Sequence, residues 1–219
     1  SERVVLTGHK GAVTSLQLSA GCERLVSCSN DRSVVLWDVV AEAGICRLRG
    51  HHDAVTDATL LGGAGGALAS VGKDGQLKLW DLHTQHCVQS IAAPSGELWS
   101  VAVDADGRRL LTGGKGAEVI LWSLETRQVL AGAGGVVDAF EDRDAVARAR
   151  SENGGGGGGG GGWAALHATM VGQVPLTGTV RVARLSGLHV CAVTSCAFSS
   201  SGARLASCGL DGMHTVALW

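Results

Sequence analysis

The sequence predicts an all-β fold built from repeated four-stranded units, and three observations lead to this prediction. An apolar phrase that ends in tryptophan recurs at Trp37, Trp80 and Trp122, roughly every 42 residues. The dipeptide Gly-His opens the first two units, at Gly8 and Gly50. Glycine is abundant, with 34 residues, and only 4% of the residues are aromatic, as suits short strands joined by tight turns. A period of about 40–45 residues of this kind is typical of a blade of a β-propeller.

Each unit divides into four short strands. In the first unit, residues 13–18 alternate apolar and polar side chains, which indicates a strand buried on one face. The later strands of this unit are expected at 24–28, 34–37 and 45–48. The second unit repeats the pattern at 54–60, 67–71, 76–80 and 87–91, and the third at 98–103, 109–112, 119–122 and 128–130.

The rest of the chain predicts a degenerate fourth blade and a fifth, so about five blades in all. Residues 179–185 are expected to close the fourth blade, with Ala183 where tryptophan belongs, and 192–219 to form the fifth. Between the third and fourth blades, nine consecutive glycines at 154–162 predict flexible coil. The expected division is therefore blades one to three at 1–130, a charged and glycine-rich insertion at 131–162, and two blades at 163–219, in the same propeller or a second one.

Residues 3–7 precede the first Gly-His and are expected to form an outer strand that has no blade of its own. They would complete the fifth blade and close a five-bladed ring, within the usual range of about four to eight blades. We favour an incomplete part of a larger propeller, because Ser1 and Trp219 both lie inside a repeated phrase. An open arc would expose strand edges and apolar blade faces.

Charge and cysteine usage exclude several classes of function. The net charge of −2 gives no basic field for direct binding of nucleic acid or anionic lipid. No apolar run approaches the ~20 residues that span a bilayer, and no signal peptide opens the sequence. The seven cysteines are scattered without a CxxC spacing, which argues against a disulfide framework or a zinc site and favours an intracellular protein.

Four residue types recur at equivalent positions and are expected to form a buried hydrogen-bond network in each blade. The complete sets are His9, Ser27, Asp31 and Trp37 in the first unit and His51, Ser70, Asp74 and Trp80 in the second. Histidine, serine and aspartate are also the members of a hydrolase triad, but an active site is not normally copied once per blade. We therefore expect a structural role, in which serine links histidine to the indole N–H and aspartate accepts from histidine.

The later units keep only part of this set. The third unit retains Thr112 and Trp122, but Pro94 and Gly116 replace its histidine and aspartate. The last unit retains all four members, His189, Ser207, Asp211 and Trp219. The third and fourth blades are therefore expected to be the least stable part of the propeller.

No other motif predicts catalysis or a cofactor. His83, His86 and Cys87 resemble metal ligands, but a fourth ligand is not apparent and a solvated turn is the simpler interpretation. Residues 113–116 lack the spacing of a phosphate-binding loop. We predict a protein that is not an enzyme, with no cofactor, metal or small-molecule substrate.

Binding residues of a propeller are expected on the rim of its central channel, just before the first strand of a blade or in the turn between the second and third strands. In this chain those positions hold charged residues of both signs, which indicates a surface for proteins rather than a phosphate groove. The candidates are Lys10, Arg32, Asp53, Lys73, Glu97 and Lys115. The alternative is that each is an ordinary solvated charge.

The first half of the chain resembles one family closely. The phrases VVLTGHKGAVTSL, WDVVAEAGICRLRGHHDAVTDA, SVGKDGQLKLWDLHTQHC and ELWSVAV, within residues 3–124, are similar to early repeats of the large tandem-propeller WD-repeat (WD40) subunit of the small-subunit processome. This resemblance implies a non-catalytic scaffold in the nucleolus that acts in small-subunit ribosome assembly and rRNA processing. Its partners would be other proteins of a large assembly and, indirectly, the pre-ribosomal ribonucleoprotein with its guide RNA.

Residues 163–219 resemble a different family. The phrase AVTSCAFSSSGARLASCGLDGMHTVALW is similar to an echinoderm microtubule-associated-protein-like repeat. That resemblance implies tubulin as a partner and a cytoplasmic, cytoskeletal location. A generic WD-repeat adaptor is a third possibility, because one fold hosts all three functions.

Overall fold

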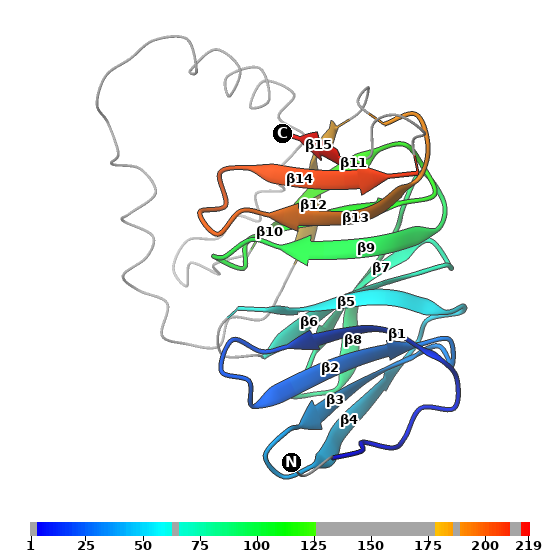
Figure 1. Cartoon of the computed structure of the whole chain (residues 1–219), viewed down its shortest axis with the longest axis vertical. Helices are drawn as coiled ribbons and strands as arrows, with labels where there is room; N and C mark the ends of the chain where they lie inside the picture. Colours follow the sequence, from blue (N-terminus) through cyan, green and yellow to red (C-terminus); the bar gives the residue numbers. More distant parts are fainter. Residues whose placement is uncertain (1–3, 63–65, 126–177, 186–188, 211–215) are drawn as a thin grey trace, which may run out of the picture. The chain divides into compact units, whose positions relative to one another are not determined.

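The computed structural model of the protein describes residues 4–62, 66–125, 178–185, 189–210 and 216–219 (Figure 1). These residues contain fifteen β-strands in four antiparallel sheets, and no helix lies among them. No helix in this described part is long and apolar enough to cross a membrane. The all-β prediction is confirmed.

Each of the first three sheets is a four-stranded antiparallel sheet, and we number the sheets 1 to 4 in chain order. Sheet 1 contains β1 (Val13–Leu18), β2 (Arg24–Ser29), β3 (Ser33–Asp38) and β4 (Ala43–Arg49). Sheet 2 contains β5 (Val55–Leu61), β6 (Ala67–Gly72), β7 (Gln76–Asp81) and β8 (His86–Ala92). Sheet 3 contains β9 (Leu98–Val103), β10 (Arg109–Gly114), β11 (Val119–Glu125) and β12 (Gly178–Leu185). Sheet 4 contains β13 (Val193–Phe198), β14 (Leu205–Gly209) and β15 (Val216–Leu218).

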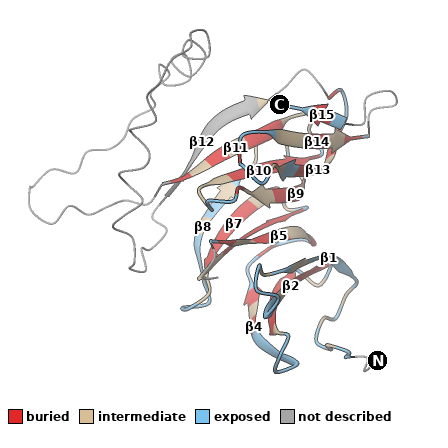
Figure 2. Ribbon diagram, turned by 60° about the vertical axis from the view of Figure 1, so that its left-hand side comes forward, coloured by how far each residue is buried: buried red, intermediate tan, exposed pale blue. Residues whose placement is uncertain are grey.

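Consecutive sheets pack through their first strands: β1 contacts β5, β5 contacts β9, and β9 contacts β13 (Figure 1). Apolar side chains of both sheets fill the space between sheets 1 and 2; among them, Leu36 and Leu48 pack with Val55, Leu68 and Trp80. Figure 2 shows that burial is concentrated in the middle strands of the sheets. The series is open, since no described strand of sheet 4 pairs with a strand of sheet 1.

Polar side chains on the first strands join one sheet to the next. Thr14 Oγ1 donates to the Val55 carbonyl at 2.6 Å, and Ser15 Oγ donates to Asp57 Oδ1 at 2.7 Å. Asp57 Oδ2 accepts the Val101 N–H at 2.9 Å, so this one carboxylate contacts sheets 1, 2 and 3. Burial raises the pKa of Asp57, although these hydrogen bonds oppose the increase. The inner strands are thus held by hydrogen bonds as well as by apolar packing.

The structure corrects the expected role of residues 179–185. They belong to β12, which pairs with β11 as the outermost strand of sheet 3, with Ala183 opposite Leu121. The role of outer strand had been expected for 128–130, which lie outside the described residues. The sequence did not reveal this because an antiparallel partner can follow a long connection: each doubling of the loop length costs only about 0.6 kcal/mol in closure entropy.

Four sheets are therefore described where about five blades were expected. Residues 4–7 were expected to form an outer strand, but they form no strand in the structure, and Thr7 and Gly8 lie over Trp37 of sheet 1 instead. A strand needs the free edge of a neighbouring sheet, and these residues pair with no described sheet. The division at 1–130, 131–162 and 163–219 stays a prediction, because residues 126–177 lie outside the described residues.

Candidate functional site

The first hydrogen-bond network lies within sheet 1 and the residues that precede it. His9 Nδ1 is 3.0 Å from Asp31 Oδ2, and His9 Nε2 is 2.7 Å from Ser27 Oγ. Trp37 Nε1 donates to the same Ser27 oxygen at 2.7 Å. Since the indole can only donate, the serine hydroxyl donates to Nε2, and Nδ1–H donates to the carboxylate. The structure thus brings together all four residues predicted for this unit.

The second network repeats this geometry in sheet 2. His51 Nδ1 lies 2.9 Å from Asp74 Oδ2, and His51 Nε2 lies 2.7 Å from Ser70 Oγ, which accepts from Trp80 Nε1 at 2.8 Å. The side chains of His51 and Asp74 are only 1% and 6% exposed. Gly72 is required beside them, because a Cβ there would meet the Ala54 carbonyl oxygen at 2.8 Å.

The order of hydrogen bonds in both networks is that of a Ser-His-Asp triad. The burial of the serine distinguishes a catalytic triad from a structural hydrogen-bond network. Ser27 and Ser70 are 3% and 0% exposed. Each hydroxyl already accepts from an indole N–H and donates to histidine, so no substrate carbonyl has access to it. The arrangement satisfies buried polar groups, which is a structural task.

Ionisation in the second network is that of a neutral histidine beside a carboxylate. Burial lowers the pKa of His51, although Asp74 beside it opposes this effect. Burial also acts to raise the pKa of Asp74, but the hydrogen bond from the His52 backbone N–H and the adjacent His51 outweigh it and lower that pKa. In sheet 1, hydrogen bonds from Ser33 and Lys10 outweigh burial in the same way and lower the pKa of Asp31.

Sheets 3 and 4 hold reduced networks. In sheet 3, Trp122 Nε1 donates to Thr112 Oγ1 at 2.9 Å, and Pro94 and Gly116 offer no side-chain partner for a longer chain of hydrogen bonds. In sheet 4, the Ser207 hydroxyl lies 2.7 Å from His189 Nε2 and accepts from Trp219 Nε1 at 2.9 Å. Asp211, the predicted fourth member, lies outside the described residues.

The residues that resemble metal ligands lie in the turn between β7 and β8. Asp81 closes this turn by accepting the His83 N–H at 2.8 Å and the Thr84 hydroxyl at 3.0 Å. His86 Nδ1 hydrogen-bonds to the Thr84 carbonyl. No group of three or more His, Cys, Asp or Glu side chains within the described ranges could hold a metal ion.

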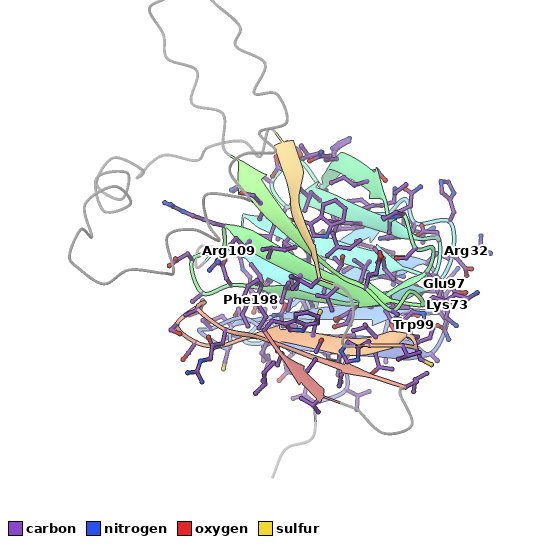
Figure 3. The ribbon with its side chains drawn as sticks, turned by 90° about the horizontal axis from the view of Figure 1, so that it is seen from above. Arg32, Lys73, Glu97, Trp99, Arg109 and Phe198 are labelled. Carbon is purple, nitrogen blue, oxygen red and sulfur yellow. The ribbon has the colours of Figure 1, made fainter. Side chains whose placement is uncertain are left out.

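All six predicted rim residues lie at one end of the strands. Lys10, Asp53 and Glu97 precede the first strands of sheets 1, 2 and 3, and Arg32, Lys73 and Lys115 occupy the turns between the second and third strands. Because the second strand is antiparallel to the first, both connections fall at the same end. Figure 3 shows Arg32, Lys73 and Glu97 on the same side of the molecule.

Trp99 belongs to this rim but was not among the predicted site residues. It stands in β9 where β1, β5 and β13 have threonine, so the departure from the repeat was the available signal. Its Nε1 donates to Glu97 Oε2 at 3.2 Å, and Lys115 Nζ lies 3.3 Å from Glu97 Oε1. These two contacts lower the pKa of Glu97. The rim therefore combines a partly buried aromatic ring, an ion pair and the exposed cations Lys73 and Arg32.

At the other end of the strands, Arg109 joins sheet 3 to sheet 4. Its Nε donates to Asp104 Oδ2 at 2.8 Å and its Nη2 to the Gly202 carbonyl at 2.8 Å. The guanidinium carbon lies 5.6 Å from the centroid of the Phe198 ring, within cation–π range (Figure 3). The sequence did not reveal this contact, because its partners are 93 residues apart.

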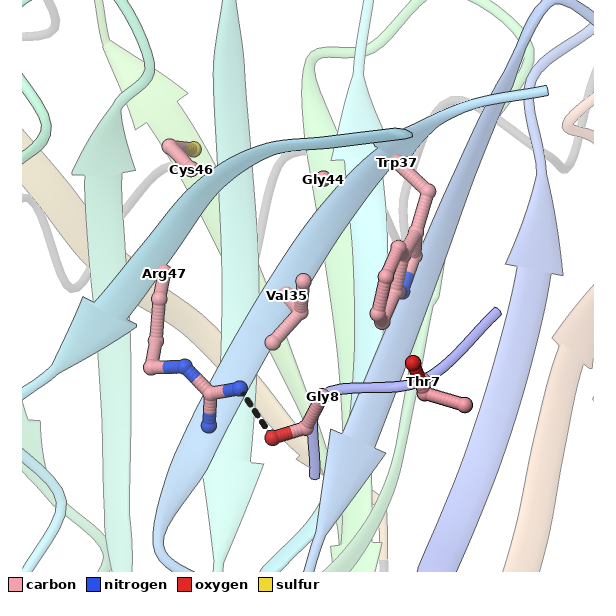
Figure 4. A pocket seen from close by; sticks show the side chains of 7 residues that line it. All are labelled: Thr7, Gly8, Val35, Trp37, Gly44, Cys46 and Arg47. Atoms are coloured by element: carbon pink, nitrogen blue, oxygen red, sulfur yellow. Dashed lines mark hydrogen bonds between the residues drawn. The ribbon is translucent and has the colours of Figure 1, made fainter. Parts of the chain in front are cut away.

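A pocket of about 260 Å³ opens beside sheet 1, between residues 7–8 and strands β3 and β4 (Figure 4). Arg47 on its wall donates to the Gly8 carbonyl at 2.6 Å and to Ser33 Oγ at 2.8 Å. These donors are already used within the chain, and the remaining wall is largely Val35, Trp37 and Cys46. The pocket therefore offers no convergent polar groups for a small ligand.

Repeated antiparallel sheets, stacked through their first strands and each carrying a tryptophan hydrogen-bonded to a buried hydroxyl, define a protein of the β-propeller repeat class. The family described as "WD domain, G-beta repeat" (WD40) matches residues 1–38, 44–81, 85–123 and 183–214. These matches cover more than half of the chain, which therefore belongs to the WD40 family. The family is generally one of non-catalytic scaffolds for protein interactions.

The matches also show that the sequence repeat and the sheet are out of phase. The second match begins within β4, the outer strand of sheet 1, and ends at Asp81 in β7 of sheet 2. The fourth match begins at Ala183 within β12 of sheet 3 and continues into sheet 4. The family match thus agrees with the position of β12 as an outer strand.

Curated relatives share about 30% identity with part of this chain. The nuclear distribution protein nudF of Aspergillus niger is 30% identical over 129 residues, which are 58% of this chain and 29% of that protein. The pre-mRNA-splicing factor cwf17 of Schizosaccharomyces pombe is 31% identical over 120 residues, 55% of this chain and 35% of the relative. The guanine nucleotide-binding protein subunit beta-1 of Nicotiana tabacum is 27% identical over 143 residues, 63% and 38% of the two chains. The chain thus spans well under half the length of these relatives.

Proposed function

We propose that the rim formed by Lys10, Arg32, Asp53, Lys73, Glu97 and Lys115, together with Trp99, is the surface through which this scaffold binds protein partners. The observation that supports the proposal is the convergence of these side chains, from three sheets, at one end of the strands. A partly buried tryptophan among charges of both signs has the composition of a protein interface, where aromatic residues are enriched. Among the described side chains, no group of three or more His, Cys, Asp or Glu could hold a metal ion.

For the biological process, we infer small-subunit ribosome assembly and rRNA processing in the nucleolus. The support is the resemblance of residues 3–124 to the processome subunit, carried by phrases longer than the common repeat pattern. The relatives are named for nuclear distribution, for pre-mRNA splicing and as a G-protein subunit, so membership of the family does not by itself select a process. With a net charge of −2, association with pre-ribosomal RNA would pass through other proteins of the assembly.

The test is purification of the tagged chain from cells, with measurement of nucleolar enrichment and of co-purified pre-ribosomal RNA. The double variant Arg32→Glu/Lys73→Glu should lose both, because it reverses two exposed rim cations. The control Arg24→Glu/Arg204→Glu makes the same charge change at the other end of the strands and should retain both. If nucleolar enrichment and co-purified RNA were lost in both double variants, or in neither, the assignment of the rim as the binding surface would be contradicted.

A microtubule-binding propeller is the second candidate, and the resemblance of residues 163–219 favours it. In this case tubulin would be the partner and the protein would be cytoplasmic. Co-sedimentation with microtubules, without enrichment in the nucleolus, would replace the first proposal with this one. Capture of peptides without either result would support a generic WD-repeat adaptor.

A further inference from the structure

Each first strand contains a β-bulge close to the rim. The register of pairing between the first and second strands shifts once in each sheet, so that one residue of the first strand is skipped. The skipped residues are Thr14, Thr56, Trp99 and Thr194. A bulge takes a residue out of the ladder and can redirect its side chain, and bulges are frequent beside functional sites. The four positions are therefore free to serve a purpose other than strand pairing.

In sheets 1 and 2 the bulge residue joins its sheet to the next one. Thr14 Oγ1 donates to the Val55 carbonyl at 2.6 Å, and Thr56 Oγ1 donates to the Leu98 carbonyl at 2.7 Å. Each acceptor comes just before the bulge of the following sheet. A threonine at the bulge of sheet 3 would by the same rule donate to the Val193 carbonyl in sheet 4.

Trp99 occupies the bulge of sheet 3 and makes a different contact. Its Nε1 donates to Glu97 Oε2 at 3.2 Å, so the indole is held by a residue nearer the rim on its own strand (Figure 3). The other carboxylate oxygen of Glu97 lies 3.3 Å from Lys115 Nζ. The ring is thus fixed at the rim before a partner binds, which reduces the entropy lost on binding.

The position after the bulge keeps its sheet-joining bond at all three junctions. Ser15 Oγ donates to Asp57 Oδ1 at 2.7 Å at the first junction, and Asp57 Oδ2 accepts the Val101 N–H at 2.9 Å at the second. At the third junction, Ser100 Oγ accepts the Cys196 N–H at 3.3 Å. Sheet 4 is therefore joined to sheet 3 beside the bulge without a threonine there, and the packing of the sheets gives no reason for a tryptophan.

We propose that Trp99 determines which protein segment the rim accepts, by packing against a large apolar side chain of that segment; this assignment rests on the proposed function of the rim. Because Glu97 uses the indole N–H, the part of the ring that is left for a partner is apolar. The ammonium group of Lys115, on the same carboxylate, disfavours a cationic side chain at the ring. Tryptophan is among the residue types enriched in binding hot spots.

The probe is a library of short random peptides, selected for binding to the 219-residue chain. The enriched peptides should share a large apolar residue, and replacement of that residue by serine should abolish binding. Trp99→Thr should weaken the binding of these peptides about 30-fold or more, as expected for a hot-spot tryptophan. Trp99→Phe keeps an aromatic ring and should weaken it less than about 10-fold.

Thermal unfolding separates this role from a purely structural one. Trp99→Thr supplies the hydroxyl that the other first strands have, so its melting temperature should stay within about 3 °C of the wild-type value. Loss of a core tryptophan would instead lower it by ~6 °C or more. The matched control Thr56→Val removes the equivalent bond between sheets 2 and 3. It should lower the melting temperature by about 2–4 °C and leave peptide binding unchanged.

The same variants distinguish a failure of this assignment from a failure of the rim as a whole. If Trp99→Thr binds the peptides as the wild type does and Arg32→Glu/Lys73→Glu does not, the rim is the binding surface but the role of Trp99 is wrong. If neither variant weakens binding, or if no peptide is enriched, both proposals are wrong. Loss of binding by Trp99→Thr together with a melting temperature lower by ~6 °C or more would show a core residue, which would overturn the assignment.

Discussion

Replacement of Ser70 by alanine tests whether the buried network stabilises the fold as its geometry indicates. The hydroxyl is fully buried, donates to His51 Nε2 at 2.7 Å and accepts from Trp80 Nε1 at 2.8 Å. Its removal leaves two buried polar groups unpaired, at about 1–3 kcal/mol each, so the expected loss of unfolding free energy is roughly 2–6 kcal/mol. That is a large part of the ~5–15 kcal/mol by which a typical domain is stable.

Sheet 3 supplies a matched comparison. Thr112→Val removes a hydroxyl at the equivalent position but keeps the volume, and only the Trp122 N–H loses its partner, so about 1–3 kcal/mol should be lost. Ser70→Thr changes the packing but keeps the hydroxyl. Its comparison with Ser70→Ala therefore separates the loss of the hydroxyl from a change of packing. Urea unfolding followed by tryptophan fluorescence would measure all three variants. Equal costs for Ser70→Ala and Thr112→Val, or a cost below about 1 kcal/mol for Ser70→Ala, would refute the reasoning.

Three further predictions concern pH, the contact between sheets 3 and 4, and a close backbone approach. Because burial holds the pKa of His51 below its ordinary 6.5, the stability that the neutral ring contributes is present above pH 6.5 and is lost as the pH falls below it. The melting temperature should therefore fall more between pH 7 and pH 5 in the wild-type chain than in His51→Gln, and equal falls would contradict this. Arg109→Ala should cost about 1–2 kcal/mol and speed hydrogen exchange in β13 and β14, whereas exchange unchanged there would show that the contact does not hold sheet 4. Gly114→Ala should cost about 1–3 kcal/mol or more, since its Cβ would meet the Glu97 carbonyl oxygen, while Gly66→Ala, with open space around it, serves as the neutral control in chemical denaturation.

The local pattern of the sequence was sufficient for the strands and for the networks. Residues 13–18 were expected as a strand because their side chains alternate, and β1 has the same bounds. His51, Ser70, Asp74 and Trp80 were placed together by their spacing alone, because the repeat sets the same residue types at nearly the same spacing in sheets 1 and 2.

Features that depend on contacts between sheets could not be predicted from the sequence repeat or from the alternation of side chains. Alternation in residues 179–185 shows that they form a strand but not which edge they join, so β12 was assigned to the wrong sheet. The approach of Arg109 to Gly202 and the three-sheet contacts of Asp57 depend on how one sheet packs on the next. In the sequence, Trp99 differs from the threonine that the other first strands have at its position. That difference does not indicate which residues the tryptophan contacts.

The phase difference between sequence repeat and sheet has a consequence for how such a chain changes in evolution. A duplicated or deleted segment of one repeat length, such as 44–81, carries the outer strand of one sheet and three strands of the next. When the segment is gained or lost, the strand before the junction and the strand after it still find partners of the usual kind, so no sheet is left broken. Gain or loss of one such segment therefore changes the number of sheets by one and leaves each remaining sheet with an outer strand.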